Sequence, residues 1–206
     1  MKPTRIPLFP LDVVLLPGMA LPLHIFEPRY KLMIGRCMDE ATEFGVILAE
    51  KKGIARFGCT AEIAQKLKDY PDGRMDIMTE GRSVFHLLEL LEEREYYEAI
   101  VEFPEEGGAP LDARRETRLT QLFQQAHLLL AGQEWALANT NTEISLAYRI
   151  AGRLPLELAE KQGLLEMRAE QERQEFLFGW LGAFLPELER RARVRQRASG
   201  NGQGLN

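Results

Sequence analysis

The sequence predicts an α+β protein with a strand-rich first half and a helical second half. Residues 1–103 hold short apolar segments separated by proline- and glycine-containing turns, as in a small barrel or a strongly curved sheet. After residues 104–110, a Pro-, Glu- and Gly-rich linker, apolar residues recur at helical spacing. We therefore expect a β-rich subdomain at 1–103, a helical bundle at 111–189 and a basic, disordered tail at 190–206.

The bulk composition is that of a globular protein. The chain has 206 residues, of which 45% are hydrophobic and 28% are charged, and its formal net charge is −5. This balance gives no whole-chain signal for nucleic acid, and no apolar stretch reaches the roughly 18 residues of a membrane span. We expect a cytoplasmic protein with no membrane partner. Cys37 and Cys59 are too far apart for a metal-binding pair, so we expect two buried thiols.

The opening residues predict three short strands joined by tight turns. Arg5–Phe9 is the first, and its prolines restrict pairing to an edge or to the strand ends. Val13–Leu16 is the second apolar run. Pro17-Gly18 then predicts a turn, because proline presets φ and glycine accepts a positive φ. Ala20–Phe26 follows as the third strand.

A helix is predicted to begin at Pro28, since a missing N–H costs nothing at the first helical position. One apolar stripe follows at helical spacing. Its members are Tyr30, Met33, Ile34, Cys37, Met38 and Ala41.

Further strands are predicted up to residue 103. Phe44–Ala49 is apolar throughout, as in a strand buried on both faces. Phe57–Ile63 is the next strand, and Pro71-Asp72-Gly73 predicts a turn. Gly81 is expected to separate a strand containing Met75 and Ile77 from one at Val84–Leu91. The last strand is Tyr97–Phe103.

The second half predicts several helices. Leu119, Leu122, Phe123, Ala126, Leu129 and Leu130 form one helical stripe that Gly132 can end, and Thr140–Glu143 is a capping box. A short helix is expected from Pro155 to Gln162, capped by Gly163. The last helix is predicted from about Leu164 to Leu185, with Pro186 ending or kinking it. Gly179 and Gly182 would let another backbone approach.

The middle of that last helix, Arg168 to Glu175, is almost wholly polar. A helix that is polar all round can bridge packed regions through solvent. The other interpretation is the exposed face of an ordinary bundle. We favour the second interpretation slightly.

An ordered set of segments resembles the N-terminal domain of the Lon family of ATP-dependent proteases. The likeness covers nearly all of Arg5 to Leu185. It is carried by Ile6–Leu11, Val14, Pro17-Gly18, Leu21–Leu23, Phe26-Glu27, Arg29-Tyr30, Gly58–Ile63, Asp72-Gly73, Gly81-Arg82, Phe85, Leu154–Leu156 and Lys161–Glu166.

The resemblance implies a six-stranded PUA-like pseudo-β-barrel followed by an α-helical bundle with a long last helix. It also implies a role in recognising substrate proteins. The ATPase and peptidase modules of Lon proteases have no counterpart here, because no GxxxxGK[ST] motif occurs and no serine lies in a matching site. We therefore predict a non-catalytic recognition module without a cofactor. Expected partners are client or unfolded proteins and a Lon-type protease in trans, and a weak homo-oligomer stays open.

The candidate recognition surface comprises Glu27, Arg29, Tyr30 and Met33, at the corner where a strand meets a helix. An acid near a helix N-terminus is electrostatically favourable. The alternative interpretation of this corner is a structural clamp.

Two other functions are weighed. An RNA-binding PUA-like module would use the arginines of the tail, which give residues 186–197 a net charge of +3; a solubilising tail is the simpler interpretation. A hydrolase would need a serine or cysteine beside a base. No metal site is expected, because His24, His86 and His127 have no second histidine at ligand spacing.

Overall fold

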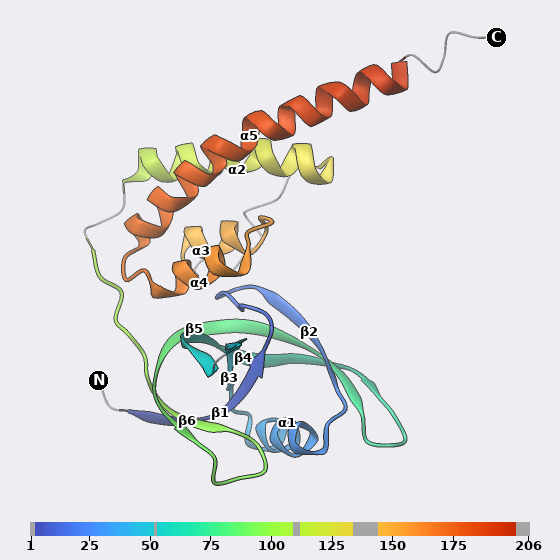
Figure 1. Ribbon diagram of the computed structural model, residues 1–206, viewed down its shortest axis with the longest axis vertical. Coiled ribbons are helices and arrows are strands. Elements are labelled where there is room, and N and C mark those ends of the chain that lie inside the picture. Colours follow the sequence, from blue (N-terminus) through green and yellow to red (C-terminus); the bar gives the residue numbers. More distant parts are fainter. Residues whose placement is uncertain (1–2, 52, 109–111, 134–143, 201–206) are drawn as a thin grey trace, which may run out of the picture. The chain divides into compact units, whose positions relative to one another are not determined.

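The computed structural model describes residues 3–51, 53–108, 112–133 and 144–200, with side chains up to residue 194. Figure 1 follows the chain through these parts. In order, the elements are β1 (Thr4–Leu11), β2 (Ala20–Ile25), α1 (Pro28–Glu40), β3 (Phe44–Glu50), β4 (Gly53–Asp69), β5 (Met75–Leu91), β6 (Glu98–Glu102), α2 (Ala113–Ala131), α3 (Leu146–Ala151), α4 (Leu158–Glu166) and α5 (Glu170–Gly200).

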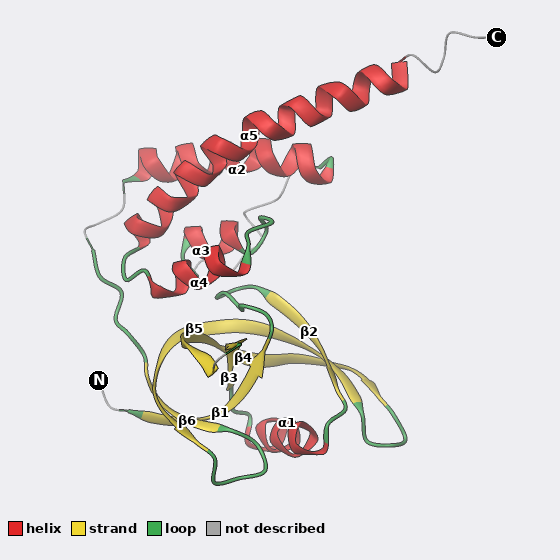
Figure 2. Ribbon diagram, viewed as in Figure 1, coloured by secondary structure: helices red, strands yellow, loops and turns green. Residues whose placement is uncertain are grey.

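The chain divides into two compact units. The barrel unit comprises Met1–Glu106 with Ala151–Arg168, and the helical unit comprises Gly107–Ile150 with Ala169–Asn206. Figure 2 shows the strands together in the first unit and α2 and α5 in the second. The boundary between Glu106 and Gly107 falls within the expected linker at residues 104–110. The second segment, Ala151–Arg168, was expected in the helical bundle and instead belongs to the barrel unit, because α4 packs on β4.

The six strands form one mixed sheet in the order β2-β5-β4-β3-β1-β6. β1 pairs with β3 in parallel and with β6 antiparallel. The late part of β5 also pairs with β6, which links the two sides of the sheet and curls it into a pseudo-barrel. The predicted six-stranded pseudo-barrel, with a helical half and a long last helix, is confirmed.

In the barrel core, Gly45 of β3 lets the side chains of Ile6 and Phe85 lie directly against the backbone. Phe85 is fully buried, together with Leu8, Val101 and Ala99. A Cβ on Gly45 would lie 2.9 Å from both the Phe85 ring and Ile6. Because interiors are close-packed, a glycine at this crowded position lets the strands and Phe85 pack together.

Two predictions within the barrel were wrong. Val14–Leu16 is a buried loop instead of a strand. Gly81 lies inside one continuous strand, β5, and does not separate two strands. A Cβ on Gly81 would overlap the carbonyl oxygen of Leu16, and the Gly81 amide donates to Met19 O over 3.0 Å. The glycine therefore permits the buried loop to cross the strand.

The first helix agrees with its predicted stripe up to Cys37, whereas Met38 is half-buried and Ala41 is exposed. α1 begins at Pro28 and buries Tyr30, Met33, Ile34 and Cys37. It ends at Ala41, whose φ of 50° is left-handed and whose amide donates to the carbonyls of Cys37 and Met38. Such a left-handed cap satisfies carbonyls that the helix would otherwise leave unpaired.

The short helix α4 differs from its predicted bounds. It runs from Leu158 to Glu166, so Gly163 lies within it and does not cap it. Glu157 and Glu160 form a reciprocal capping box at its start. Gln162 Nε2 donates to the carbonyl oxygen of Phe57 in β4 over 3.1 Å, which ties α4 to the barrel unit.

In the helical unit, α2 packs along α5. Asp112 caps α2 by accepting from the Arg114 amide, and Gly132 ends the helix with φ of 71°, as predicted. The helix buries Leu119, Phe123 and Ala126. The predicted capping box at Thr140–Glu143 lies outside the described residues.

The polar middle of the last helix is neither a solvent bridge nor a simple exposed face. α5 begins at Glu170, and Arg173 and Gln174 are fully buried. The Glu170 carboxylate accepts from the Ala147 amide over 2.8 Å and from Arg173 Nε over 3.1 Å. Sequence periodicity assigned these side chains to solvent, but hydrogen bonds between them allow their burial.

Helix α5 also extends further than predicted, through Pro186 to Gly200. Part of the expected disordered tail is therefore helical. Glu187 pairs with Arg190 and Arg191, and Glu189 pairs with Arg193, at the helical spacings that support a helix. Among the described residues no atom lies within 4 Å of a Cβ built on Gly179 or Gly182, so the predicted backbone approach is not found.

Candidate functional site

A shallow hollow of about 510 Å³ lies on the three strands at one end of the barrel unit. We call its lining residues, together with the neighbouring Phe26, the hairpin face. The lining residues are Pro22, Leu23 and His24 of β2, Leu67 and Lys68 of β4, and Asp76 and Ile77 of β5. The β4–β5 hairpin and β2 thus combine segments more than 40 residues apart in the sequence.

Strand register determines which polar groups meet on this face. His24 lies opposite Asp76, and Asp76 lies opposite Lys68. The Asp76 carboxylate contacts His24 Nδ1 at 2.5 Å and accepts from the Tyr70 hydroxyl at 2.8 Å. The hydrogen bonds from His24 and then from Tyr70 lower the pKa of Asp76, because both favour the ionised form.

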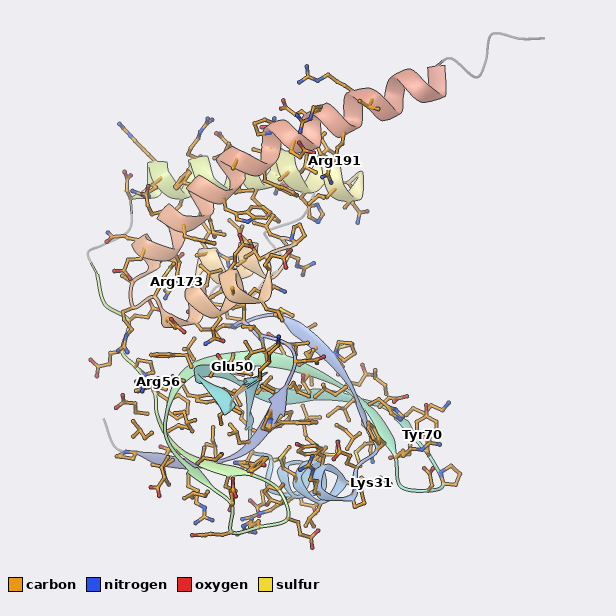
Figure 3. All side chains as sticks on the ribbon, viewed as in Figure 1. Lys31, Glu50, Arg56, Tyr70, Arg173 and Arg191 are labelled. Atoms are coloured by element: carbon orange, nitrogen blue, oxygen red, sulfur yellow. The ribbon has the colours of Figure 1, made fainter. Side chains whose placement is uncertain are left out.

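The turn of the hairpin is fixed by aromatic and ionic contacts around Tyr70, which Figure 3 labels. Lys68 and Arg74 lie over its ring, at 4.5 and 5.0 Å from the centroid. Lys31 of α1, also labelled, donates to the carbonyl oxygen of Asp72 over 3.0 Å. The tip of the hairpin is therefore connected to the helix as well as to β2.

Large apolar side chains on and beside the hairpin face are open to solvent. Phe26 is 58% exposed and Leu67 is 48% exposed. Phe26 stacks against His24, with ring centroids 5.9 Å apart. Exposed apolar groups that gather beside polar ones are typical of surfaces that bind other proteins.

The structure separates the four predicted surface residues into two pairs. Glu27 and Arg29 are partly exposed at the corner and pair with each other over 2.9 Å. Tyr30 is buried and stacks on Phe9 with centroids 3.9 Å apart, and Met33 is fully buried. Tyr30 and Met33 therefore belong to the core of the barrel unit and cannot contact a partner in this conformation. For Glu27 and Arg29, the role stays a prediction.

Sequence reasoning missed Leu67 and Asp76. Leu67 stands in a polar run, Lys66 to Asp69, which was not assigned to a strand. The signal that could have found it is its alternation with Lys66 and Lys68, which places it on the other side of a strand. Asp76 could not be found this way, because its partner His24 is 52 residues distant.

The other candidate residues from the sequence, the histidines and cysteines, do not form a metal site in the part of the chain that the structure describes. That part contains no group of three or more His, Cys, Asp or Glu side chains able to hold a metal ion. His86 contacts Glu102 at 2.9 Å, and His127 contacts the carbonyl oxygen of Gln133 at 2.9 Å. Cys37 and Cys59 are free and buried, and burial raises the pKa of both thiols. No helix in the described ranges is both long and apolar enough to span a bilayer.

The Asp76 contacts predict acid-sensitive stability. Because the folded-state pKa of Asp76 is lowered, its contribution to the free energy of unfolding is fully present above the unfolded-state pKa of about 4 and is lost as pH falls through the folded-state pKa. Asp76→Asn is expected to lower the urea midpoint at pH 6, and the difference from the unmodified protein should shrink below pH 4. Asp39→Asn, which removes an exposed carboxylate of α1, is the control. A difference for Asp76→Asn that is constant from pH 6 to pH 3 would contradict the assigned contacts.

Comparison with known proteins identifies relatives over most of the chain. The Lon protease of Escherichia coli (strain K12) is 30% identical over 211 residues, which cover 94% of this chain and 26% of that protein. The Lon protease of Flavobacterium johnsoniae is 25% identical over 205 residues. The chain therefore spans about a quarter of the length of the curated relatives it matches.

Solved structures show the same fold. The Lon N-terminal domain protein from Xanthomonas campestris has a TM-score of 0.66 at 25% identity, covering 86% of this chain and 98% of that chain. The N-terminal domain of the Mycobacterium avium complex Lon protease has a TM-score of 0.69 at 19% identity, covering 87% and 98%. Residues 5–182 match the family model described as the ATP-dependent protease La (LON) substrate-binding domain. The resemblance inferred from the opening segments is thus confirmed, and the chain belongs to the Lon substrate-binding domain family.

Proposed function

We propose that this protein is a non-catalytic recognition module that binds exposed apolar segments of client proteins through the hairpin face. The observation that carries the proposal is the exposure of Phe26 and Leu67 around a hollow on the barrel unit. Membership of a substrate-binding family supports a role in substrate recognition. We assign the binding to the hairpin face, and we expect the bound segment to be apolar.

The geometry of the hairpin face suits an extended apolar segment. Its hollow is open and shallow, so it can accept a side chain without enclosing a small ligand. Full burial of one large apolar side chain is worth about 1.5–3 kcal/mol. One or two such contacts give weak, reversible binding, which fits a module that must accept many sequences and then release them.

A client protein bound by this module would then be degraded by a separate protease. The family description supports a role in substrate recognition, and the 206 residues contain no GxxxxGK[ST] motif. We propose that a Lon-type protease acting in trans receives the client. Glu27 and Arg29, which follow Phe26 and are partly exposed, are the polar rim that we assign to this surface. A cytoplasmic location and a weak homo-oligomer stay predictions.

Binding of an unfolded model protein tests the proposal. Labelled lactalbumin, reduced and carboxymethylated so that it cannot fold, is titrated with the full chain and followed by fluorescence anisotropy. Phe26→Ser/Leu67→Ser is expected to weaken binding by about tenfold or more, because two apolar contacts are lost. Stability should change little, since both side chains are largely exposed.

The matched control removes exposed leucines elsewhere. Leu128→Ser/Leu130→Ser changes two side chains of α2 that are 47% and 43% exposed. This variant should bind like the unmodified protein. Equal loss in both variants would show that general surface hydrophobicity, and not the hairpin face, binds the client.

The RNA-binding alternative is not favoured. The arginines of the tail that would contact phosphates are partly neutralised within α5, where Arg190 and Arg191 pair with Glu187, and Arg193 pairs with Glu189. The matching family model is described as the substrate-binding domain of a protease. Adding nuclease to a lysate capture experiment provides the check: captured protein that disappears with nuclease would restore this alternative.

A further inference from the structure

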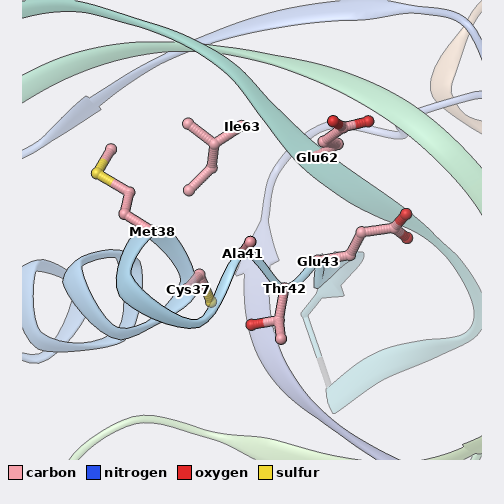
Figure 4. A pocket seen from close by; sticks show the side chains of 7 residues that line it. All are labelled: Cys37, Met38, Ala41, Thr42, Glu43, Glu62 and Ile63. Atoms are coloured by element: carbon pink, nitrogen blue, oxygen red, sulfur yellow. The ribbon is translucent and has the colours of Figure 1, made fainter.

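A second hollow of about 420 Å³ lies in the barrel unit between the end of α1 and β4 (Figure 4). Met38 and Ala41 line it from the helix, and Ile63 lines it from the strand. Glu43 and Glu62 place two carboxylates at one end of it, as the close view shows. The hollow thus combines an apolar wall with an acidic end, and it shares no residue with the hairpin face.

The hollow lies at an open edge of the sheet. β3 begins at Phe44, opposite Ala61 of β4. Beyond Ala61, β4 continues to Asp69 and pairs only with β5 among the described strands. The other edge of this part of β4 therefore offers backbone N–H and C=O groups without a strand partner. Glu43 directly precedes β3, and Glu43 and Glu62 both line the hollow. The hollow therefore lies where β3 would be longer at its N-terminal end if α1 did not precede it.

The far part of this edge carries bulges and lysines, whereas the stretch from Ala61 to Ile63 carries neither. The pairing of β4 with β5 shifts between Cys59 and Ala61, between Ile63 and Gln65 and again between Lys66 and Lys68, as at β-bulges. Bulges and lysines are devices that prevent indiscriminate strand pairing. Between Ala61 and Ile63 the pairing is regular, and the lysines begin only at Lys66. The stretch beside the hollow is therefore the part of the edge that can accept a short added strand.

The charge around the hollow favours a cationic group. Arg82 pairs with Glu62 and lies 3.4 Å from Glu80, and the charge of Glu43 also acts on it. These four groups are three carboxylates and one guanidinium, so together they carry a net negative charge. The C-terminal end of α1, with its partial negative charge, adjoins the same hollow at Ala41. A lysine or arginine could place its alkyl stem on Met38 and Ile63 and its charge near Glu43.

We propose that the edge of β4 at Glu62 and Ile63 binds a short extended segment of a client protein as an added β-strand, with a lysine or arginine side chain of that segment in the adjoining hollow. Main-chain hydrogen bonds provide affinity that does not depend on sequence, and the hollow provides the preference for a basic residue. This inference rests on the proposed function, because it names a second contact for the same clients. It predicts that clients with a basic residue in an extended apolar segment bind more tightly than those without one.

A designed peptide tests the inference. The probe is a short acetylated and amidated peptide of alternating threonine and valine with one central lysine. Two partner peptides replace that lysine by glutamate or carry N-methyl groups at alternate backbone nitrogens. Each is titrated by fluorescence anisotropy against the full chain and against Glu43→Gln. The control Glu50→Gln removes an exposed carboxylate at the opposite end of β3.

The lysine peptide should bind about tenfold more tightly than the glutamate peptide, and Glu43→Gln should weaken its binding about fivefold while Glu50→Gln leaves it unchanged. N-methylation should weaken binding about tenfold, because it removes backbone donors and keeps the side chains. Equal binding of the lysine and glutamate peptides, or of the N-methylated peptide and its parent, would overturn the inference.

Unfolded lactalbumin is measured on the same samples to separate the two proposals. If the unmodified protein binds lactalbumin but shows none of the peptide preferences, the inference at β4 fails and the proposed function stands. If it does not bind lactalbumin, or if it binds and Phe26→Ser/Leu67→Ser leaves the affinity unchanged, the proposed function fails, whatever the peptides do.

Discussion

Replacing Arg173 by methionine is expected to destabilise the helical unit by about 3–5 kcal/mol, because it would leave the Glu170 carboxylate buried without its cation. Arg173 is 1% exposed and is a large buried side chain of α5 (Figure 3). Its Nε donates to Glu170 over 3.1 Å, and its guanidinium lies 4.5 Å from the centre of the Tyr148 ring. Glu170 in turn accepts from the Ala147 amide, at the start of α3.

This arrangement connects segments that are distant in the sequence. Through Glu170 and Arg173, the first turn of α5 holds both Ala147 and Tyr148 of α3. Gln174 Nε2 also donates to Glu170, over 3.1 Å. A short helix such as α3 is not stable alone, so these contacts provide much of what holds it in place. Loss of the arginine should therefore loosen α3 as well as the start of α5.

Urea unfolding followed by tryptophan fluorescence provides the measurement, because both tryptophans, Trp135 and Trp180, fall within the sequence of the helical unit. Arg118→Met, which removes an exposed arginine of α2, is the control and should stay within about 0.5 kcal/mol. Glu170→Gln should recover part of the loss in the Arg173→Met background, since a neutral amide still accepts from Ala147 but carries no buried charge. Strictly additive effects of the two changes would contradict the ion pair as the cause.

Replacing Gly81 by alanine is expected to lower the free energy of unfolding of the barrel unit by about 3 kcal/mol. The new Cβ would overlap the carbonyl oxygen of Leu16 and would lie 3.2 Å from the Cys59 sulfur. Two hydrogen bonds hold this crossing together, from Gly81 N to Met19 O and from Gly18 N to Gly81 O at 2.8 Å. Relief of the overlap would lengthen both of them.

Urea unfolding and thiol labelling both report on this change. Cys59 is fully buried beside Gly81, so opening of the crossing should speed its reaction with a thiol reagent. Gly35→Ala in α1 is the control, because no atom among the described residues lies within 4 Å of its added Cβ. That variant should be more stable by up to about 1 kcal/mol, since alanine is the better helix former. Gly81→Ala as stable as the unmodified protein would show that the Leu16 loop moves freely away from β5.

Several elements were predictable because near neighbours determine them. The stripe from Tyr30 to Cys37 predicted α1, and Pro28 predicted its first residue, as observed. Gly132 was expected to end α2 and does so with a left-handed φ. In each case the information lies within four residues, in the helical period or in the φ range that proline and glycine allow.

Other elements were mistaken because the same residue types have two uses. A glycine in a strand pattern suggested a break at Gly81, whereas the structure uses it for close approach of the buried loop. Pro186 was expected to end or kink the last helix; it does not end it, because α5 continues to Gly200, supported by the ion pairs that follow it. The polar run from Arg168 to Glu175 suggested solvent, and its partners in α3 lie more than 20 residues away. Local propensity does not reveal such partners.

The sequence by itself determined the strand-rich and helical halves, the stripe of α1 and the likeness to the Lon N-terminal domain. Only the tertiary structure decided the candidate surfaces. Strand register placed His24 beside Asp76 and opened the edge of β4 beside Glu43, while packing buried Tyr30 and Met33. The physical reason is the distance along the sequence over which each effect acts. Helical periodicity and φ preferences depend on residues within a few positions of one another. Strand register, burial and charge pairing depend on residues that only the folded chain brings together.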